Sequence, residues 1–181
     1  MKKCIVISDS FKGSLSSGEI CEIARECFAK VLPECDLTAI PVADGGEGTV
    51  DCFHQVCGGE LVPVTVQGPF GQDMEVRYLQ LNGGRAVIEM ASSAGLPLVG
   101  DRRDPRVTST YGVGQQIRHA VEQGNTQILL GLGGSCTNDG GCGCAAALGV
   151  RFLHREGQTF IPTGGTLDQI AHIDVSGARQ L

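Results

Sequence analysis

The sequence lacks the features that would direct a chain into a membrane or onto nucleic acid. No run of about 18 apolar residues occurs, and the basic start Met1-Lys2-Lys3 is followed by only four apolar residues before Ser8. We therefore expect neither a membrane span nor a secretory signal. The net charge is −6 and no basic stripe is present, which argues against nucleic acid as a partner. We expect a cytoplasmic protein that has no membrane partner.

The sequence also lacks any C-x-x-C pair, although it contains nine cysteines. An odd number of scattered cysteines favours reduced thiols over a disulfide framework. Cys142 and Cys144 are one residue apart, but no second pair of Cys or His stands at a spacing that would complete the four ligands of a structural zinc site. We therefore predict no zinc.

Two familiar phosphate-binding motifs are absent as well. A Walker A loop requires a glycine-lysine pair followed by a hydroxyl residue, and the chain contains no glycine-lysine pair. A Rossmann fingerprint could start at Gly131 and Gly133, but Cys136 stands where the third glycine is needed. If the chain binds phosphate, it does so with a different loop.

The most informative segment that is present is the glycine-rich run 131–141. It follows an apolar segment, 127–130, that reads as a strand covered on both faces, and it precedes a small-residue helix expected over 141–148. Glycines allow a backbone to approach a ligand closely, and a helix N-terminus attracts anions. Asp139 adds a carboxylate to this loop. The alternative is ordinary turn chemistry that links a strand to a helix.

A second loop repeats this design. The segment 41–49 follows a short strand, 37–40, precedes a helix expected over 49–56, and contains Asp44, Gly45, Gly46 and Glu47. Carboxylates beside phosphate-binding amides would repel phosphate unless Mg²⁺ lies between them or one of them accepts a proton. The repeat favours a site for phosphate and magnesium.

A third loop, 8–14, follows an apolar strand over 4–7 and contains Ser10 and Lys12. Ser16 and Glu19 then form a predicted capping box, and apolar residues at helical spacing extend an amphipathic helix over 17–32. Lys12 would lie at the carboxyl end of the first strand, where open α/β sheets bind ligands. There it could neutralise phosphate charge, although a solvated surface lysine is the alternative.

The middle of the chain does not show the strand-loop-helix pattern of these three segments. Segments 60–67, 73–81 and 85–90 predict an antiparallel meander, and a helix is expected from the cap at 108–110 to residue 123. We predict an α/β fold with a mostly parallel sheet flanked by helices, in which the meander begins a second lobe. The lobes are placed at 1–58 and 59–181. Glu89, at the end of a strand, is either a metal-site carboxylate or a solvated side chain.

Four multi-residue segments resemble the bacterial type of glycerate kinase, and the resemblance covers the whole chain in order. These segments are Asp9-Ser10-Phe11-Lys12-Gly13-Ser14, Ala43-Asp44-Gly45-Gly46-Glu47-Gly48-Thr49, Thr108-Ser109-Thr110-Tyr111-Gly112-Val113-Gly114 and residues 131–141. Members of that family phosphorylate D-glycerate with ATP, between two lobes. Family chains are about twice as long, so the resemblance is to an amino-terminal half.

The resemblance implies MgATP and D-glycerate as ligands, and a homo-oligomer is compatible with it. Asp139 or Asp44 would be the base or the metal-holding carboxylate, Glu47 would support Asp44 at Mg²⁺, and Lys12 would meet phosphate. The residues predicted to bind substrate or phosphate are Ser10, Gly45, Gly46, Thr110, Gly112, Gly133, Gly134, Ser135, Thr137 and Asn138.

Several questions stay open in the sequence. The glycerate carboxylate could bind at the hydroxyl-rich helix start 108–114 or to Arg77, Arg85 or Arg106. A non-catalytic fragment that binds an anion or nucleotide is the rival to a kinase. A sugar-phosphate isomerase, which would act without ATP, finds no supporting His-Glu pair on one element. The sequence also does not say whether 2- or 3-phosphoglycerate is the product.

Overall fold

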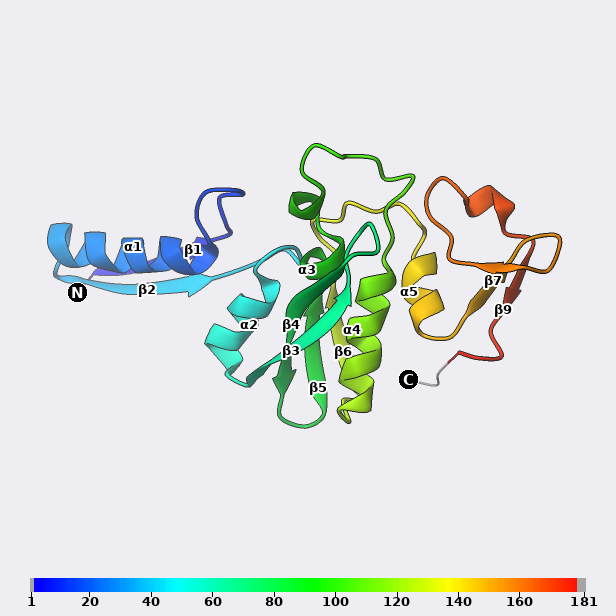
Figure 1. Ribbon diagram of the computed structural model, residues 1–181. Coiled ribbons are helices and arrows are strands. Elements are labelled where there is room, and N and C mark those ends of the chain that lie inside the picture. The colour runs from blue at the N-terminus through cyan, green and yellow to red at the C-terminus, as the bar shows by residue number, and fades with distance from the viewer. Residues whose placement is uncertain (1, 179–181) are drawn as a thin grey trace.

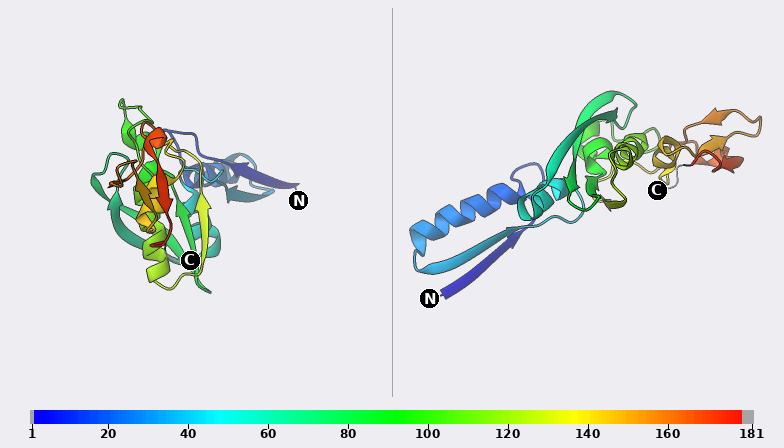
Figure 2. Two further views of the ribbon diagram at one scale, coloured as in Figure 1. Left: turned by 90° about the vertical axis from the view of Figure 1, so that its right-hand side faces the viewer. Right: turned by 90° about the horizontal axis from the view of Figure 1, so that it is seen from below.

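The structure, a computed structural model, describes residues 2–178, and its elements lie in three groups along an elongated molecule (Figure 1). A two-stranded sheet at one end and a three-stranded sheet at the other flank a central four-stranded sheet. Figure 2 shows the first group extending away from the rest. Within the described residues, none of the helices combines the length and the apolarity that crossing a bilayer requires.

The first group, which we call the arm, consists of β1 (Lys2–Ser8), α1 (Ser17–Val31) and β2 (Cys35–Pro41). β1 and β2 are parallel, and Ser8 stands opposite Pro41 in their register. Ser17 ties the ends of both strands together, because its hydroxyl donates to Ser8 O at 2.6 Å and accepts from Val42 N at 2.9 Å. The loops that follow β1 and β2 are therefore held side by side.

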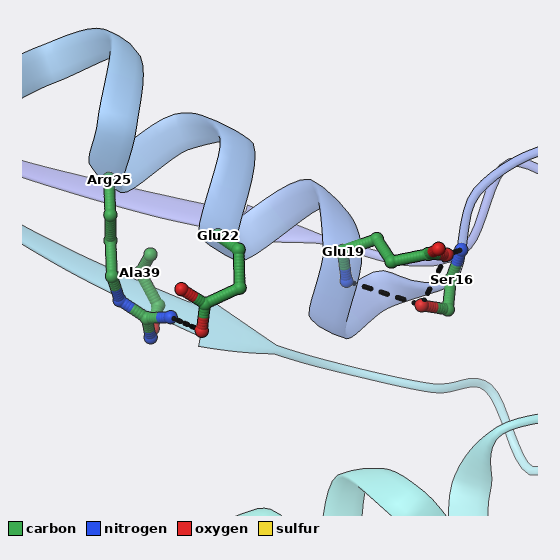
Figure 3. A network of polar contacts seen from close by, with 5 residues as sticks. All are labelled: Ser16, Glu19, Glu22, Arg25 and Ala39. Carbon is green, nitrogen blue, oxygen red and sulfur yellow. Dashed lines mark hydrogen bonds and ion pairs between the residues drawn. The ribbon is translucent and has the colours of Figure 1, made fainter.

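The predicted capping box at the start of α1 is confirmed (Figure 3). Glu19 N donates to Ser16 Oγ at 3.2 Å, and Ser16 N donates to Glu19 Oε2 at 2.7 Å, so two helix-end donors are satisfied reciprocally. One turn further on, Arg25 contacts Glu22 at 2.7 Å and donates to the carbonyl of Ala39 in β2 at 2.9 Å. The helix is thereby fastened along the sheet.

Only one face of the arm's sheet is covered by α1. On the other face Ile5 and Ile7 are 64% and 62% exposed. Parallel strands are ordinarily buried on both faces, so the arm is an incompletely covered piece of α/β structure.

The central group contains β3 (Glu60–Gln67), β4 (Asp73–Leu81), β5 (Arg85–Glu89) and β6 (Gln127–Gly131), in that spatial order. The first three strands form the predicted antiparallel meander, and β6 is parallel to β5. α4 (Tyr111–Glu122) packs on one face around Tyr78, Ile88 and Ile117, and α2 (Thr49–Cys57) packs on the other around Val50 and Val87. The short elements α3 (Ala91–Ala94) and η1 (Leu96–Val99) follow β5.

The third group begins with α5 (Cys142–Ala147), which packs against α4. An antiparallel sheet of β7 (Arg151–Leu153), β8 (Thr159–Phe160) and β9 (His172–Asp174) follows, with η2 (Leu167–Gln169) before its last strand. Antiparallel strands after α5 did not form part of the sequence-based expectation.

The predicted α/β class is confirmed, with parallel pairing between β1 and β2 and between β5 and β6. The expected mostly parallel sheet is wrong, because the other four strand pairings among the described residues are antiparallel. The strand over 127–130 was also expected to be covered on both faces, yet β6 is an edge strand and Leu129 is 46% exposed. An apolar run does not reveal how much of a strand its neighbours cover. The division into lobes 1–58 and 59–181 stays a prediction; in the structure α2 packs on β4 and β5.

Gly112 tests the packing of α4. A Cβ added there would overlap Gln67 O of β3, whereas one added at Gly18 in α1 would meet chiefly the flexible end of Gln55. We expect Gly112→Ala to lower the free energy of unfolding by about 1–3 kcal/mol through overpacking. Gly18→Ala is the matched control and should be neutral or slightly stabilising. Urea unfolding of both variants measures this, and equal stabilities would contradict the close packing.

Candidate active site

The two glycine-rich loops lie directly on one another. Gly133 N donates to Gly45 O at 2.9 Å, and a Cβ on Gly133 would come within 2.6 Å of Gly46 N. Gly45 has a φ of 91°, in the left-handed region that favours glycine. Several of these glycines are therefore required for the contact between the loops, which is a different reason from close approach to a ligand.

Asp139 is the buried carboxylate beneath these loops and is 1% exposed. Its Oδ2 accepts hydrogen bonds from Thr110 N and Thr110 Oγ1, both at 2.8 Å, and from Gly143 N at 3.2 Å. Its Oδ1 accepts from Gly141 N at 3.0 Å. The carboxylate thus satisfies the N-terminal donors of α5 and joins them to the start of α4.

The hydroxyl proton of Thr110 is already donated in this arrangement. Its hydroxyl donates to Asp139 and accepts from Cys144 N at 2.9 Å. Gly112 is buried in the first turn of α4, against β3. The structure gives Asp139, Thr110 and Gly112 packing and hydrogen-bonding roles; the catalytic role predicted for Asp139 and the ligand-binding roles predicted for Thr110 and Gly112 stay predictions.

A cavity of about 550 Å³ opens where the arm meets the central group. Its walls come from the loop after β1, the loop after β2, one side of α2 and the end of β5. Three residues singled out in the sequence, Ser10, Lys12 and Glu47, line it together. The volume is within the range of small-ligand sites. The loops after β1 and β2 therefore face one hollow.

Glu89 lies in the same wall, at the carboxyl end of β5. Val50 N donates to its Oε2 at 3.0 Å, so a carboxylate already occupies the first turn of α2. Burial raises the pKa of the Glu89 carboxyl above its ordinary value of 4.5, and the charges of Asp51 and Glu47 act in the same direction, while the N–H groups of Val50 and Gly48 oppose them.

The remaining predicted residues lie on the rims of the two loops. Asp44 is exposed, and its Oδ1 accepts from the N–H of buried Gly46 at 3.0 Å. In the other loop Ser135 and Thr137 share a hydroxyl contact of 2.9 Å, and Thr137 N donates to Ser135 Oγ at 3.0 Å. Gly134, with a φ of 72°, and Asn138 are exposed beside them. These side chains border solvent and do not line the 550 Å³ cavity.

The three arginines considered for a substrate carboxylate differ in position. Arg85 begins β5, at the opposite end of the strand from Glu89, and donates to Asn82 O. Arg77 pairs with Asp51 at 2.8 Å, and Arg106 grips Asp104 through two contacts of 2.8 Å. That grip lowers the pKa of Asp104 to about 2. Of the three, Arg77 is the one near the site, since it lines a neighbouring hollow with Asp51 and Glu89.

The described residues contain no group of three or more His, Cys, Asp or Glu side chains placed to hold a metal ion. Magnesium in nucleotide sites needs fewer protein ligands, because one or two carboxylates act together with the phosphates. Asp44 and Glu47, both exposed on one loop, fit that requirement.

Sequence reasoning weighed Glu89 but did not place it in the site, and it missed Ser17. Both residues stand next to candidate ligand-binding loops. Glu89 ends a strand that is parallel to the strand before a glycine-rich loop, and Ser17 begins the helix that lies between β1 and β2 in the chain. Neither position shows from sequence which backbone donors the side chain will meet.

The fold and this cavity define an α/β protein with a candidate small-ligand site at the ends of its strands, and comparisons identify the family. Residues 4–181 match the model of the glycerate kinase family. The chain belongs to the glycerate kinase family.

Individual relatives agree. The chain is 45% identical to a glycerate kinase from Bacillus subtilis over 177 residues, which are 97% of this chain and 46% of that protein. It is 39% identical to glycerate 2-kinase from Escherichia coli K12 over a similar extent. A crystal structure named for glycerate kinase 2 from Salmonella typhimurium LT2 matches with a TM-score of 0.80 at 39% identity, covering 98% of this chain and 49% of that one. The chain therefore spans about half the length of the relatives it matches, consistent with the resemblance to an amino-terminal half.

Asp139 is the strongest test of how the loops are held. Asp139→Asn would replace one acceptor oxygen with an amide group that faces N–H and O–H donors, so we expect the free energy of unfolding to fall by about 3 kcal/mol. Asp36→Asn, at an exposed position of β2, should change it by less than about 0.5 kcal/mol. Urea unfolding measures both, and a stable Asp139→Asn would show that the buried network is dispensable.

Glu89 predicts a pH dependence. Because its pKa is raised on folding, the folded chain holds this proton more tightly than the unfolded chain does, and that contribution is complete below pH 4.5 and lost as the pH rises through the raised pKa. The stability of the wild type relative to Glu89→Gln should therefore fall as the pH rises from 4.5 through the raised pKa. Urea unfolding at a series of pH values measures the difference; a flat or rising difference would contradict the raised pKa.

Proposed function

We propose that this chain provides the catalytic site of a glycerate kinase, which transfers the γ-phosphoryl group of ATP to a hydroxyl of D-glycerate. The observation that carries the proposal is the cavity that Ser10, Lys12, Glu47 and Glu89 line together in a member of this family. A cationic side chain, a hydroxyl and carboxylates facing one hollow are the groups that phosphoryl transfer requires.

In this proposal Lys12 neutralises charge on the transferred phosphoryl group. The amides and hydroxyls at Gly133, Gly134, Ser135, Thr137 and Asn138 hold the remaining phosphates from the adjoining loop. Asp44 and Glu47 would hold Mg²⁺, which when bound neutralises charge on the phosphates. Because Asp139 is buried and accepts four hydrogen bonds, we assign it to holding the loops in place rather than to proton transfer.

A second function has one observation in its favour. The chain spans about half of its relatives, 46% of the Bacillus subtilis protein, so it could bind an anion or nucleotide without completing the reaction. In that case ATP or glycerate binds and no ADP is released.

The further proposals are a cytoplasmic location, D-glycerate as the small-molecule partner, no nucleic acid or membrane partner, and self-association as an open outcome. An isomerase would convert its substrate without ATP.

Release of ADP in a coupled assay, with calorimetry of ATP and D-glycerate separately, distinguishes these functions. We expect ADP release that depends on D-glycerate, and a loss of about tenfold or more in ATP affinity or kcat/KM for Lys12→Ala, because a charge-assisted contact to phosphate is removed. Lys30→Ala, in the last turn of α1, is the matched control and should behave as the wild type.

Each result of the ADP-release assay and calorimetry supports or rejects a particular function. Binding without turnover supports the binding fragment, and absence of both binding and turnover rejects both functions. If Lys12→Ala keeps the wild-type kcat/KM and ATP affinity, Lys12 is a solvated surface residue and the assignment of the cavity to phosphate fails.

A further inference from the structure

Glu89 differs from the other acidic side chains of the cavity in where it comes from. It is part of β5, in register with Gly131 of β6, whereas Asp9 and Glu47 are on loops and Asp51 is on the outside of α2. A side chain carried by a strand of the central sheet is held more precisely than one on a loop. Glu89 and Asp51 both line the 550 Å³ cavity and a neighbouring one of about 470 Å³.

The carboxylate of Glu89 is oriented by backbone donors. Val50 N donates to Oε2 at 3.0 Å, and the N–H of Gly48 lowers the pKa of the same carboxyl, against the effect of burial. Both donors belong to the first turn of α2 and the residue before it. Within the described residues no Lys or Arg forms an ion pair with Glu89. The carboxylate is therefore held in a fixed orientation without a cation that would weaken it as a base.

The other carboxylates of the cavity lie in different settings. Asp51 forms an ion pair with Arg77 at 2.8 Å, and Asp9 and Glu47 are on loops, where Asp9 Oδ1 accepts from the adjacent Ser10 N at 2.7 Å. Burial of Glu89 raises the pKa of its carboxyl. A general base works best when its pKa is close to the working pH.

The charged and titratable groups around Glu89 are mixed in sign. In the larger cavity they are Asp9, Lys12, Glu47, Asp51, Cys52 and His54. In the smaller one β4 adds Glu75 and Arg77. Lys12 faces the same hollow as Glu89 from the arm, so a substrate between them would meet a cation on one side and a base on the other.

We propose that Glu89 is the general base that accepts the proton of the substrate hydroxyl. This inference rests on the proposed kinase function. As the hydroxyl oxygen forms its bond to the γ-phosphorus of ATP, its proton passes to the Glu89 carboxylate. The bond between the γ-phosphorus and the bridging oxygen breaks, and the electron pair of that bond leaves with ADP. Glu89 afterwards returns its proton to solvent through the cavity.

The test is the pH profile of kcat for D-glycerate-dependent ADP release by the wild type, Glu89→Gln, Glu89→Asp and Glu75→Gln. We expect the wild-type kcat to fall on the acid side, where the base is protonated. Glu89→Gln should lower kcat by about 100-fold or more and abolish that acid limb, with KM changed by less than about threefold, because Gln preserves size but cannot accept the proton.

Two variants serve as controls. Glu89→Asp keeps a carboxylate but withdraws it by one methylene, so it should lose about tenfold or more in kcat and retain the acid limb; it also serves if Glu89→Gln does not fold. Glu75→Gln, in the exposed wall of the smaller hollow, should match the wild type in both kcat and pH profile.

The outcomes separate the two proposals. If the wild type releases ADP and Glu89→Gln keeps its kcat within about threefold or keeps the acid limb, the assignment of Glu89 fails and the kinase function stands. If Glu89→Gln lowers kcat but also raises KM and lowers the melting temperature, with the acid limb intact, Glu89 has a purely structural role. That result also overturns the assignment of Glu89 as the base. If the wild type releases no ADP, the kinase function itself fails.

Discussion

The arrangement of the site depends on the hydrogen bonds that Asp139 accepts inside the protein. A carboxylate removed from water is costly unless its oxygens find donors, and here Thr110, Gly141 and Gly143 supply four. These donors come from the beginnings of α4 and α5, so satisfying one charge fixes two helices relative to each other. The loop over 131–138 is thereby held over Gly45 and Gly46, and the second loop in turn shapes the cavity.

The same arrangement, a helix N-terminus that meets a carboxylate of the protein itself, occurs twice. α5 begins against Asp139, and α2 begins against Glu89, so each helix N-terminus that follows a glycine-rich loop already has an internal anion. The positive ends of these helices are therefore not vacant for phosphate. In the proposed kinase function, charge for a phosphorylated ligand would therefore come from Lys12 and from loop amides rather than from a helix end.

Much of the fold could be predicted from the sequence because its signals are local. The capping box of Ser16 and Glu19, the meander and the helix after Thr110 follow from short-range patterns. The contacts of Asp139 with Thr110 and of Glu89 with Val50 could not be predicted, since these partners lie 29 and 39 positions away in the chain. Glycines were the least decisive signal: in Gly133 and Gly112 the same absence of a side chain serves close packing within the protein.

The exposed strand edge of the arm favours association between copies of the chain. Among residues 2–178, β1 pairs only with β2, so the N–H and C=O groups along its outer edge have no neighbouring strand there, and Ile5 and Ile7 are exposed beside them. An open strand edge next to exposed aliphatic side chains is a template for cross-chain pairing at high concentration. Lys2 and Lys3 at the beginning of that strand supply charge repulsion that counteracts such stacking, and salt, which screens them, would weaken this protection.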